Sequence, residues 1–181
     1  SMGNTFIIKE NMLLFEGFHC GYMNIGVLLR RRVVAPTSDI IIISDEIIGN
    51  KDHVLSQHFA FGKNISLKTE SNVVIGKGER CEFSVKSFDE NGEILPDIIN
   101  SPLSRHYNQI EETSALKINT RSSYFLTTII TKNMVNKKTE IIKEDVYNFS
   151  YETILAKDAA QGYVITRNEE KYGVVLIRND V

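Results

Sequence analysis

The segment Cys81-Glu82-Phe83-Ser84-Val85-Lys86 alternates between apolar and polar side chains at every position. Successive side chains of a β-strand point to opposite faces of the sheet, so the apolar residues share one face and the polar residues share the other. One face of this strand is therefore expected to pack on a core while the other meets solvent. That behaviour is typical of an antiparallel sheet.

The run Ile40-Ile41-Ile42-Ile43 is apolar on both faces, which suits a central strand covered on two sides. Its β-branched side chains disfavour a buried helix. Runs of about 4–8 residues rich in Ile, Val, Thr, Phe and Tyr recur from Thr5–Lys9 to Tyr172–Arg178. Turn signals separate them, and Asn91-Gly92 is the strongest because both residues tolerate positive φ. The sequence thus predicts an all-β fold, an antiparallel β-sandwich.

The second half of the chain gives less regular patterns. Asn100–Glu112 lacks a clean strand period, and we expect an ordered excursion over one face of the sandwich. Val146–Phe149 and Glu152–Ala156 are predicted as strands, and Asn133–Lys138 as a polar turn.

The chain of 181 residues has the size of one domain. Ser1-Met2-Gly3 resembles the remnant of an expression tag, so residues 1–3 are set apart from the fold. Residues 4–181 contain no long linker, low-complexity tract or convincing repeat. We expect them to form a single β-sandwich domain, a fragment of a longer parent protein.

Composition argues against two classes of partner. The chain is 42% hydrophobic and 24% charged, and no stretch approaches the roughly 18 unbroken apolar residues of a membrane helix, so no membrane partner is expected. Lys and Arg total 21 against 23 Asp and Glu, a net charge of −2. Such a chain has no positive field for a phosphate backbone, so nucleic acid is not expected either.

Metal and cofactor motifs are weak. His53 and His58 are five positions apart, so on one strand they point to opposite faces and cannot share an ion without a bulge. There is no G-x-S-x-G elbow, P-loop or dinucleotide fingerprint. Cys20 and Cys81 are too few for a disulfide scaffold, and a single bridge between them is left open. We expect no metal and no cofactor.

Arg30-Arg31-Arg32 is a basic cluster whose side chains alternate across a strand, so only Arg30 and Arg32 share a face. A solvated edge or a partner surface is favoured over an anion site, although paired arginines suit carboxylates.

Ser104-Arg105-His106-Tyr107 falls in the irregular excursion. Its guanidinium, imidazole and phenol groups are suited to contact a sugar carboxylate or to stack on a ring. In the alternative interpretation, which is favoured, Tyr107 anchors the loop to the sheet and Arg105 is solvated.

Several of these segments, taken in order over roughly residues 4–132, resemble the C-terminal β-sandwich region of the heparinase II/III-like polysaccharide lyases. Asn4-Thr5-Phe6-Ile7 is similar to the end of the family's His-Asn-Thr strand without the histidine, and Phe15–Tyr22 with Leu29–Val34 is similar to a His/Gly/Tyr segment before an arginine-bearing strand. Ile42–Gly49 with His53 and His58–Gly62 is similar to the family's D-x-I-x-G … H … H-F-x-P-G stretch, but with Ala60 and Phe61 before the glycine. Ser101–Tyr107 is similar to an S-P-x-Y loop, and Thr127–Ile130 is similar to a late strand.

The resemblance implies β-elimination on acidic polysaccharides, glycosaminoglycan-like or capsular. A base removes the proton beside a uronic carboxylate, a positioned group neutralises the enolate, and an acid protonates the leaving oxygen. In the family the catalytic Tyr and Asn come from an N-terminal helical toroid, and a His comes from the β region upstream of the segments matched here. The resemblance therefore implies a non-catalytic portion of a periplasmic or extracellular lyase, with the toroid and the polysaccharide as partners.

For carbohydrate contact we select His19, Tyr22, Arg105 and Tyr107, because aromatic rings stack on sugars and guanidinium groups pair with carboxylates. No residue is assigned a catalytic role. Two alternatives stay open: a purely structural accessory sandwich that touches no sugar, and an autonomous carbohydrate-binding module.

Overall fold

The protein is built almost wholly of β-strands. The structure is a computed structural model that describes residues 5–9, 12–106, 109–133, 139–167 and 169–178. Its elements in chain order are β1 (Thr5–Lys9), β2 (Met12–His19), the 3₁₀ turn η1 (Met23–Ile25), β3 (Val27–Thr37), β4 (Ile40–Gly49), β5 (Val54–Ala60), β6 (Ser66–Glu70), β7 (Val73–Lys77), β8 (Glu82–Phe88), β9 (Glu93–Ile94), β10 (Asp97–His106), β11 (Gln109–Arg121), β12 (Phe125–Asn133), β13 (Thr139–Glu144), β14 (Ala160–Arg167) and β15 (Glu170–Ile177).

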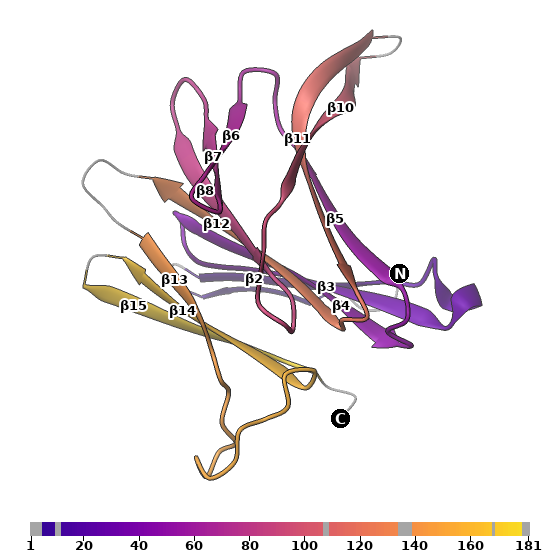
Figure 1. Cartoon of the computed structure of the whole chain (residues 1–181), viewed down its shortest axis with the longest axis vertical. Helices are drawn as coiled ribbons and strands as arrows, with labels where there is room; N and C mark the ends of the chain where they lie inside the picture. Colours follow the sequence, from indigo (N-terminus) through magenta and orange to yellow (C-terminus); the bar gives the residue numbers. More distant parts are fainter. Residues whose placement is uncertain (1–4, 10–11, 107–108, 134–138, 168, 179–181) are drawn as a thin grey trace.

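The strands form three sheets in which every strand pairing among the described residues is antiparallel. A nine-stranded sheet has the order β1-β2-β3-β4-β12-β8-β7-β6, with β9 paired to β8. Two three-stranded sheets have the orders β10-β11-β5 and β13-β14-β15. In Figure 1 they lie on opposite sides of the long sheet. The predicted all-β antiparallel sandwich is confirmed, with three layers.

Two hydrophobic clusters hold the layers together. The cluster under β5 and β11 contains Val27, Ile47, Leu55, Val74, Val85, Leu116, Ile118 and Leu126. The cluster under β13–β15 contains Ile40, Ile42, Phe88, Ile129, Ile141, Tyr163, Ile165 and Leu176. Strand β12 contributes Leu126 to the first cluster and Ile129 to the second, as the two-residue period of a strand requires.

The isoleucine run lies in the central strand β4, as predicted. Ile40 and Ile42 are fully buried in the second cluster. Ile41 stays 39% exposed. The first cluster reaches β4 at Ile47, towards the other end of the strand, so the two layers cover different parts of β4.

The alternation on β8 is confirmed for one face and wrong in part for the other. Val85 is buried in the first cluster and Phe83 packs against it, whereas Cys81, which precedes the strand, is exposed. The opposite face was expected to meet solvent, but Phe88 on that face is buried in the second cluster. The reason is the third layer, β13–β15.

The expected excursion over Asn100–Glu112 is wrong. β10 and β11 run through it as a hairpin, with Asn100 paired to Ser114. Pro102 argued against a strand, because proline has no backbone N–H to donate to the hydrogen bonds of a sheet. β10 is an edge strand, where a proline is tolerated.

The two short strands expected between Val146 and Ala156 are also absent from the described residues. That segment is joined by the isolated bridge Tyr147–Ile154. The polar turn expected after Asn133 falls mostly at residues 134–138, outside the described part. In that part, no helix has the length and apolar character to cross a membrane.

Candidate functional site

The β2–β3 connection carries two of the residues selected from the sequence. His19 ends β2 and pairs with Leu29 of β3. The chain then folds into η1, where the amides of Ile25 and Val27 both donate to the Tyr22 carbonyl, at 3.0 and 3.1 Å. Gly26 closes the turn at φ +75°, a left-handed conformation that favours glycine. The turn thus fixes Tyr22 a short distance from His19.

His19 and Tyr22 form an exposed aromatic pair. Their ring centroids are 5.3 Å apart and the rings meet edge to face at 77°. Gly21 makes this possible, since a Cβ there would lie 2.6 Å from the His19 Nε2 atom. Tyr22 remains 48% exposed. The pair therefore presents a ring face and a hydrogen-bonding imidazole to solvent, which is the kind of surface that sugars contact.

A second aromatic group lies along the same end of the long sheet. Leu29 pairs with both His19 and Ile47, and the Ile47 amide donates to the Tyr124 carbonyl at 2.8 Å. With strands about 4.8 Å apart, the backbones of His19 and Tyr124 are separated by about 14 Å. Leu29 and Tyr124 both pack against the first cluster, so this row belongs to the β5–β11 side of the sheet.

Two cations lie over Tyr124. The Arg178 guanidinium carbon is 3.6 Å from the ring centroid and the Lys51 Nζ atom is 4.9 Å from it. Cations over a tyrosine face are attracted by the ring quadrupole, and together they give this part of the row a positive character. The sequence interpretation missed this group: Lys51 stood in an ordinary turn, and nothing in the sequence brings Arg178 near Tyr124.

The structure does not bring β10 to this row. Arg105 lies in β10, but its side chain, like all of Tyr107, is outside the described residues. The β10–β11 tip is at the top of Figure 1, whereas η1 is at the right-hand edge. By its place in β10, Arg105 therefore lies in a region separate from His19 and Tyr22.

The arginine cluster alternates across β3 as predicted, but it is not a solvated edge. Arg30 and Arg32 are 3% and 8% exposed. Both donate to the Glu46 Oε2 atom and to the Ile177 carbonyl of β15, because the third layer covers this face of β3. Burial lowers the pKa of Arg32, an effect that Glu46 opposes.

Arg31 points to the other face and makes two 2.6 Å hydrogen bonds to Asp45. These bonds raise the pKa of Arg31. Arg31 is already paired with Asp45, and Arg30 and Arg32 are buried. The arginine cluster therefore joins β3 to its neighbouring strands and does not form an open anion site.

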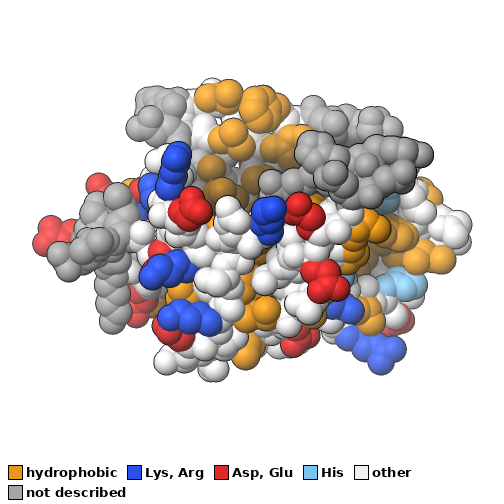
Figure 2. Space-filling view, turned by 90° about the horizontal axis from the view of Figure 1, so that it is seen from above, with side chains coloured by type: hydrophobic (Ala, Val, Ile, Leu, Met, Phe, Trp, Pro, Cys, Tyr) orange, Lys and Arg blue, Asp and Glu red, His pale blue; other side chains and the backbone are white. Residues whose placement is uncertain are grey.

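No metal centre forms among the described residues, where no group of three His, Cys, Asp or Glu side chains converges. Cys20 and Cys81 are both free and exposed, which settles the bridge that the sequence left open. Figure 2 shows that, on the face seen from above, basic and acidic side chains are interspersed, whereas hydrophobic side chains gather at the upper middle, around a hollow, and at the right.

Comparison with known proteins relates the fold to one group of enzymes. No family model and no curated protein matches the sequence. Among solved structures, the heparan sulfate lyase HepC from Pedobacter heparinus superposes with a TM-score of 0.72 at 14% identity, covering 96% of this chain and 27% of that one. Two heparinase III structures give TM-scores of 0.69 and 0.65 at 13% and 14% identity, each over 97% of this chain.

These matches establish a shared fold. The chain has the architecture of one region of heparinase III-type lyases, and it spans little more than a quarter of their length, 27% to 28%. The resemblance seen in the sequence and the superposition of the structure thus point to the same group of lyases.

Proposed function

We propose that this chain is the non-catalytic β-sandwich of a heparinase II/III-like lyase that cleaves acidic polysaccharide by β-elimination. On this proposal residues 4–181 are one domain of a longer protein, and a helical toroid supplies the catalytic groups. The observation that carries the proposal is the superposition over 96% of the chain on a heparan sulfate lyase.

The contact with carbohydrate is assigned to the row that runs from His19 and Tyr22 to Tyr124. It combines an exposed edge-to-face aromatic pair with two cations over a third ring. Stacking faces and positive charge are what an acidic sugar polymer requires. Arg105 and Tyr107 remain predicted contacts, and Arg105 lies in β10, apart from this row.

An NMR titration of the chain with heparan sulfate oligosaccharides tests this proposal. We expect shifts at His19 and Tyr22 and no formation of unsaturated-uronate absorbance. Tyr22→Ala should weaken binding about tenfold, a loss of about 1.4 kcal/mol. Phe149→Ala is the matched control, because Phe149 is a fully exposed ring on the loop between β13 and β14, and it should bind as the native chain does.

Three other outcomes would contradict parts of this proposal. No shift at either region would identify a purely structural sandwich. Turnover by this chain alone would contradict the non-catalytic assignment. Shifts confined to β10, abolished by Arg105→Ala, would move the contact to the second region.

A further inference from the structure

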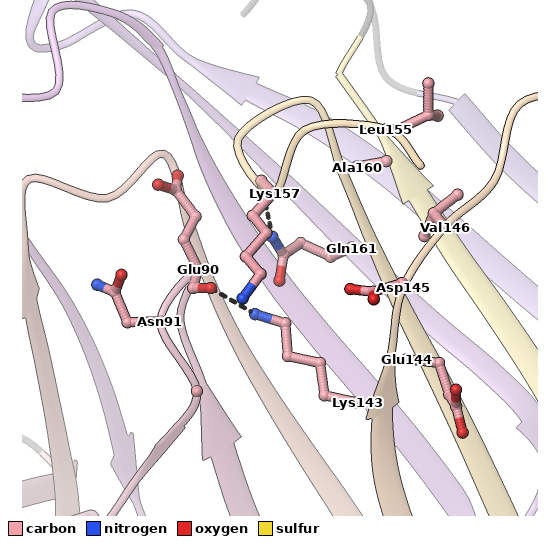
Figure 3. A pocket seen from close by; sticks show the side chains of 11 residues that line it. Glu90, Asn91, Lys143, Glu144, Asp145, Val146, Leu155, Lys157, Ala160 and Gln161 are labelled. Carbon is pink, nitrogen blue, oxygen red and sulfur yellow. Dashed lines mark hydrogen bonds between the residues drawn. The ribbon is translucent and has the colours of Figure 1, made fainter. Parts of the chain in front are cut away.

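A cleft of about 230 Å³ lies at the end of the molecule formed by the β8–β9 turn and the β13–β14 connection. The β13–β14 connection is at the bottom of Figure 1, and the β8–β9 turn adjoins Tyr124, whose amide donates to the Glu90 carboxylate. Sites for drug-sized ligands occupy about 300–1,000 Å³, so this cleft suits one small group. Figure 3 shows the side chains that line it.

Lys143, from β13, reaches into the cleft and is partly buried. Its Nζ atom donates to the backbone carbonyls of Asp89 and Glu90, the latter at 3.0 Å. An ammonium has three donors, so these two bonds leave one for a ligand. Burial lowers the pKa of Lys143, with Lys157 contributing in the same direction and Asp89 opposing it.

Lys157 approaches from the connection between β13 and β14. In Figure 3 its ammonium points to the same space as that of Lys143. Within the described part of the chain, the Lys157 ammonium makes no hydrogen bond or ion pair. Two like charges that converge repel each other, and an anion between them would relieve the repulsion.

Gln161 supplies a buried acceptor. The residue is 1% exposed, and its Nε2 atom donates to the Lys157 carbonyl. Its Oε1 atom is buried with no hydrogen-bond partner among the described residues. Figure 3 shows this oxygen facing the lysine side chains. A buried acceptor without a partner is costly, so the cleft is suited to a ligand that brings a hydroxyl donor.

The neighbouring carboxylates do not fill the cleft. Asp89 accepts from the Asn91 and Gly92 amides and from Thr120. The Glu90 carboxylate accepts from the Tyr124 amide, and in Figure 3 it points away, as does that of Glu144. Asp145 also lines the cleft, and in Figure 3 its carboxylate points towards the space beside Gln161 and the two lysines, where it can accept a second ligand hydroxyl.

We propose that this cleft binds a hydroxylated carboxylate of the size of a single sugar acid. The carboxylate bridges Lys143 and Lys157, and a hydroxyl donates to the Gln161 Oε1 atom. The inference goes beyond the proposed function and does not depend on it. The cleft adjoins the proposed row only where Glu90 accepts from the Tyr124 amide. Its reporters Lys143, Lys157 and Gln161 differ from His19 and Tyr22, so the two sites report separately in a titration.

Titration of the whole chain with sodium glucuronate, followed by NMR, tests the site. We expect saturable shifts around Lys143, Lys157 and Gln161 with a Kd near about 1 mM. Glucose, which lacks the carboxylate, should bind at least about tenfold more weakly. Lys157→Ala should weaken glucuronate binding about tenfold, and Lys171→Ala, an exposed lysine on β15, should not change it.

Gln161→Glu provides an independent variant, because it places a negative charge where the carboxylate approaches and should weaken binding further. Equal binding of glucose and glucuronate, unchanged binding by Lys157→Ala, or no saturation up to about 10 mM would overturn the proposal. Failure of the heparan sulfate titration at Tyr22 would not affect it.

Discussion

Arg30 and Glu46 face each other across β3 and β4 as a buried ion pair, with 2.6 Å between Nη2 and Oε2 and side chains 3% and 2% exposed. The same carboxylate oxygen accepts a 2.5 Å hydrogen bond from Arg32. Glu16 of β2 adds a 3.2 Å contact to Arg32. The buried Glu46 and the partly exposed Glu16 therefore balance two guanidinium groups that the third layer has enclosed.

Glu46→Gln should destabilise the fold by about 3–5 kcal/mol, because it leaves two buried guanidinium groups with too little negative charge. Urea unfolding followed by circular dichroism measures the change. Glu70→Gln is the matched control: its pair with Lys68 is also 2.6 Å long but is 62% and 56% exposed. Exposed pairs contribute about 0–1 kcal/mol, and equal losses in the two variants would contradict the argument.

Gly49→Ala should strain the turn that holds Tyr22. Gly49 has φ +123°, and an added Cβ would lie 2.2 Å from the Gly26 carbonyl oxygen. We expect a loss of about 1–3 kcal/mol and altered His19 and Tyr22 resonances. Gly173→Ala is the control, since a Cβ added at this position on β15 would have nothing within 4 Å of it and the φ of Gly173 is ordinary. Native-like η1 resonances in Gly49→Ala would disprove the proposed role.

The strand content followed from local patterns. The β-branched run Ile40–Ile43 lies in a central strand as predicted, although Ile41 is 39% exposed. Asn91-Gly92 lies in the β8–β9 turn as predicted, but Gly92 has a positive φ and Asn91 does not. The layer formed by β13–β15 was not foreseen, because the contact of Tyr163 with Phe88 joins segments about 75 residues apart and leaves no local period.

The site was predictable only in part. His19 and Tyr22 are close in sequence, so one turn brings them together. Tyr124 and Arg178 meet only through the tertiary fold, and the sequence contains no spacing that links them. The Gln161 acceptor is likewise visible only after burial is known.

The three-layer architecture predicts that both faces of β12 are sensitive to truncation. Leu126→Ala and Ile129→Ala should each cost about 2–5 kcal/mol, because each empties a fully buried site in a different cluster. Ile142→Ala, at a 43% exposed position on β13, should cost less. Urea unfolding compares the three, and a small loss for Ile129→Ala would mean that β13–β15 do not cover the sheet.

Glu90 should make stability depend on pH in a defined direction. Burial raises the pKa of this carboxyl above its usual 4.5, and the Tyr124 amide and Lys51 oppose the shift. The folded state therefore holds the proton more tightly than the unfolded state. The resulting stabilisation is present below pH 4.5 and is lost as the pH rises through the folded pKa.

Glu90→Gln removes this titration while keeping an amide oxygen as acceptor for the Tyr124 amide. The stability of the native chain relative to Glu90→Gln should therefore fall as the pH is raised from about 4 to about 8. Thermal unfolding of both proteins across that range measures the difference. Glu140→Gln, an exposed glutamate on β13, is the matched control. A difference that stays constant, or that grows in favour of the native chain as the pH rises, would show that burial does not dominate at Glu90.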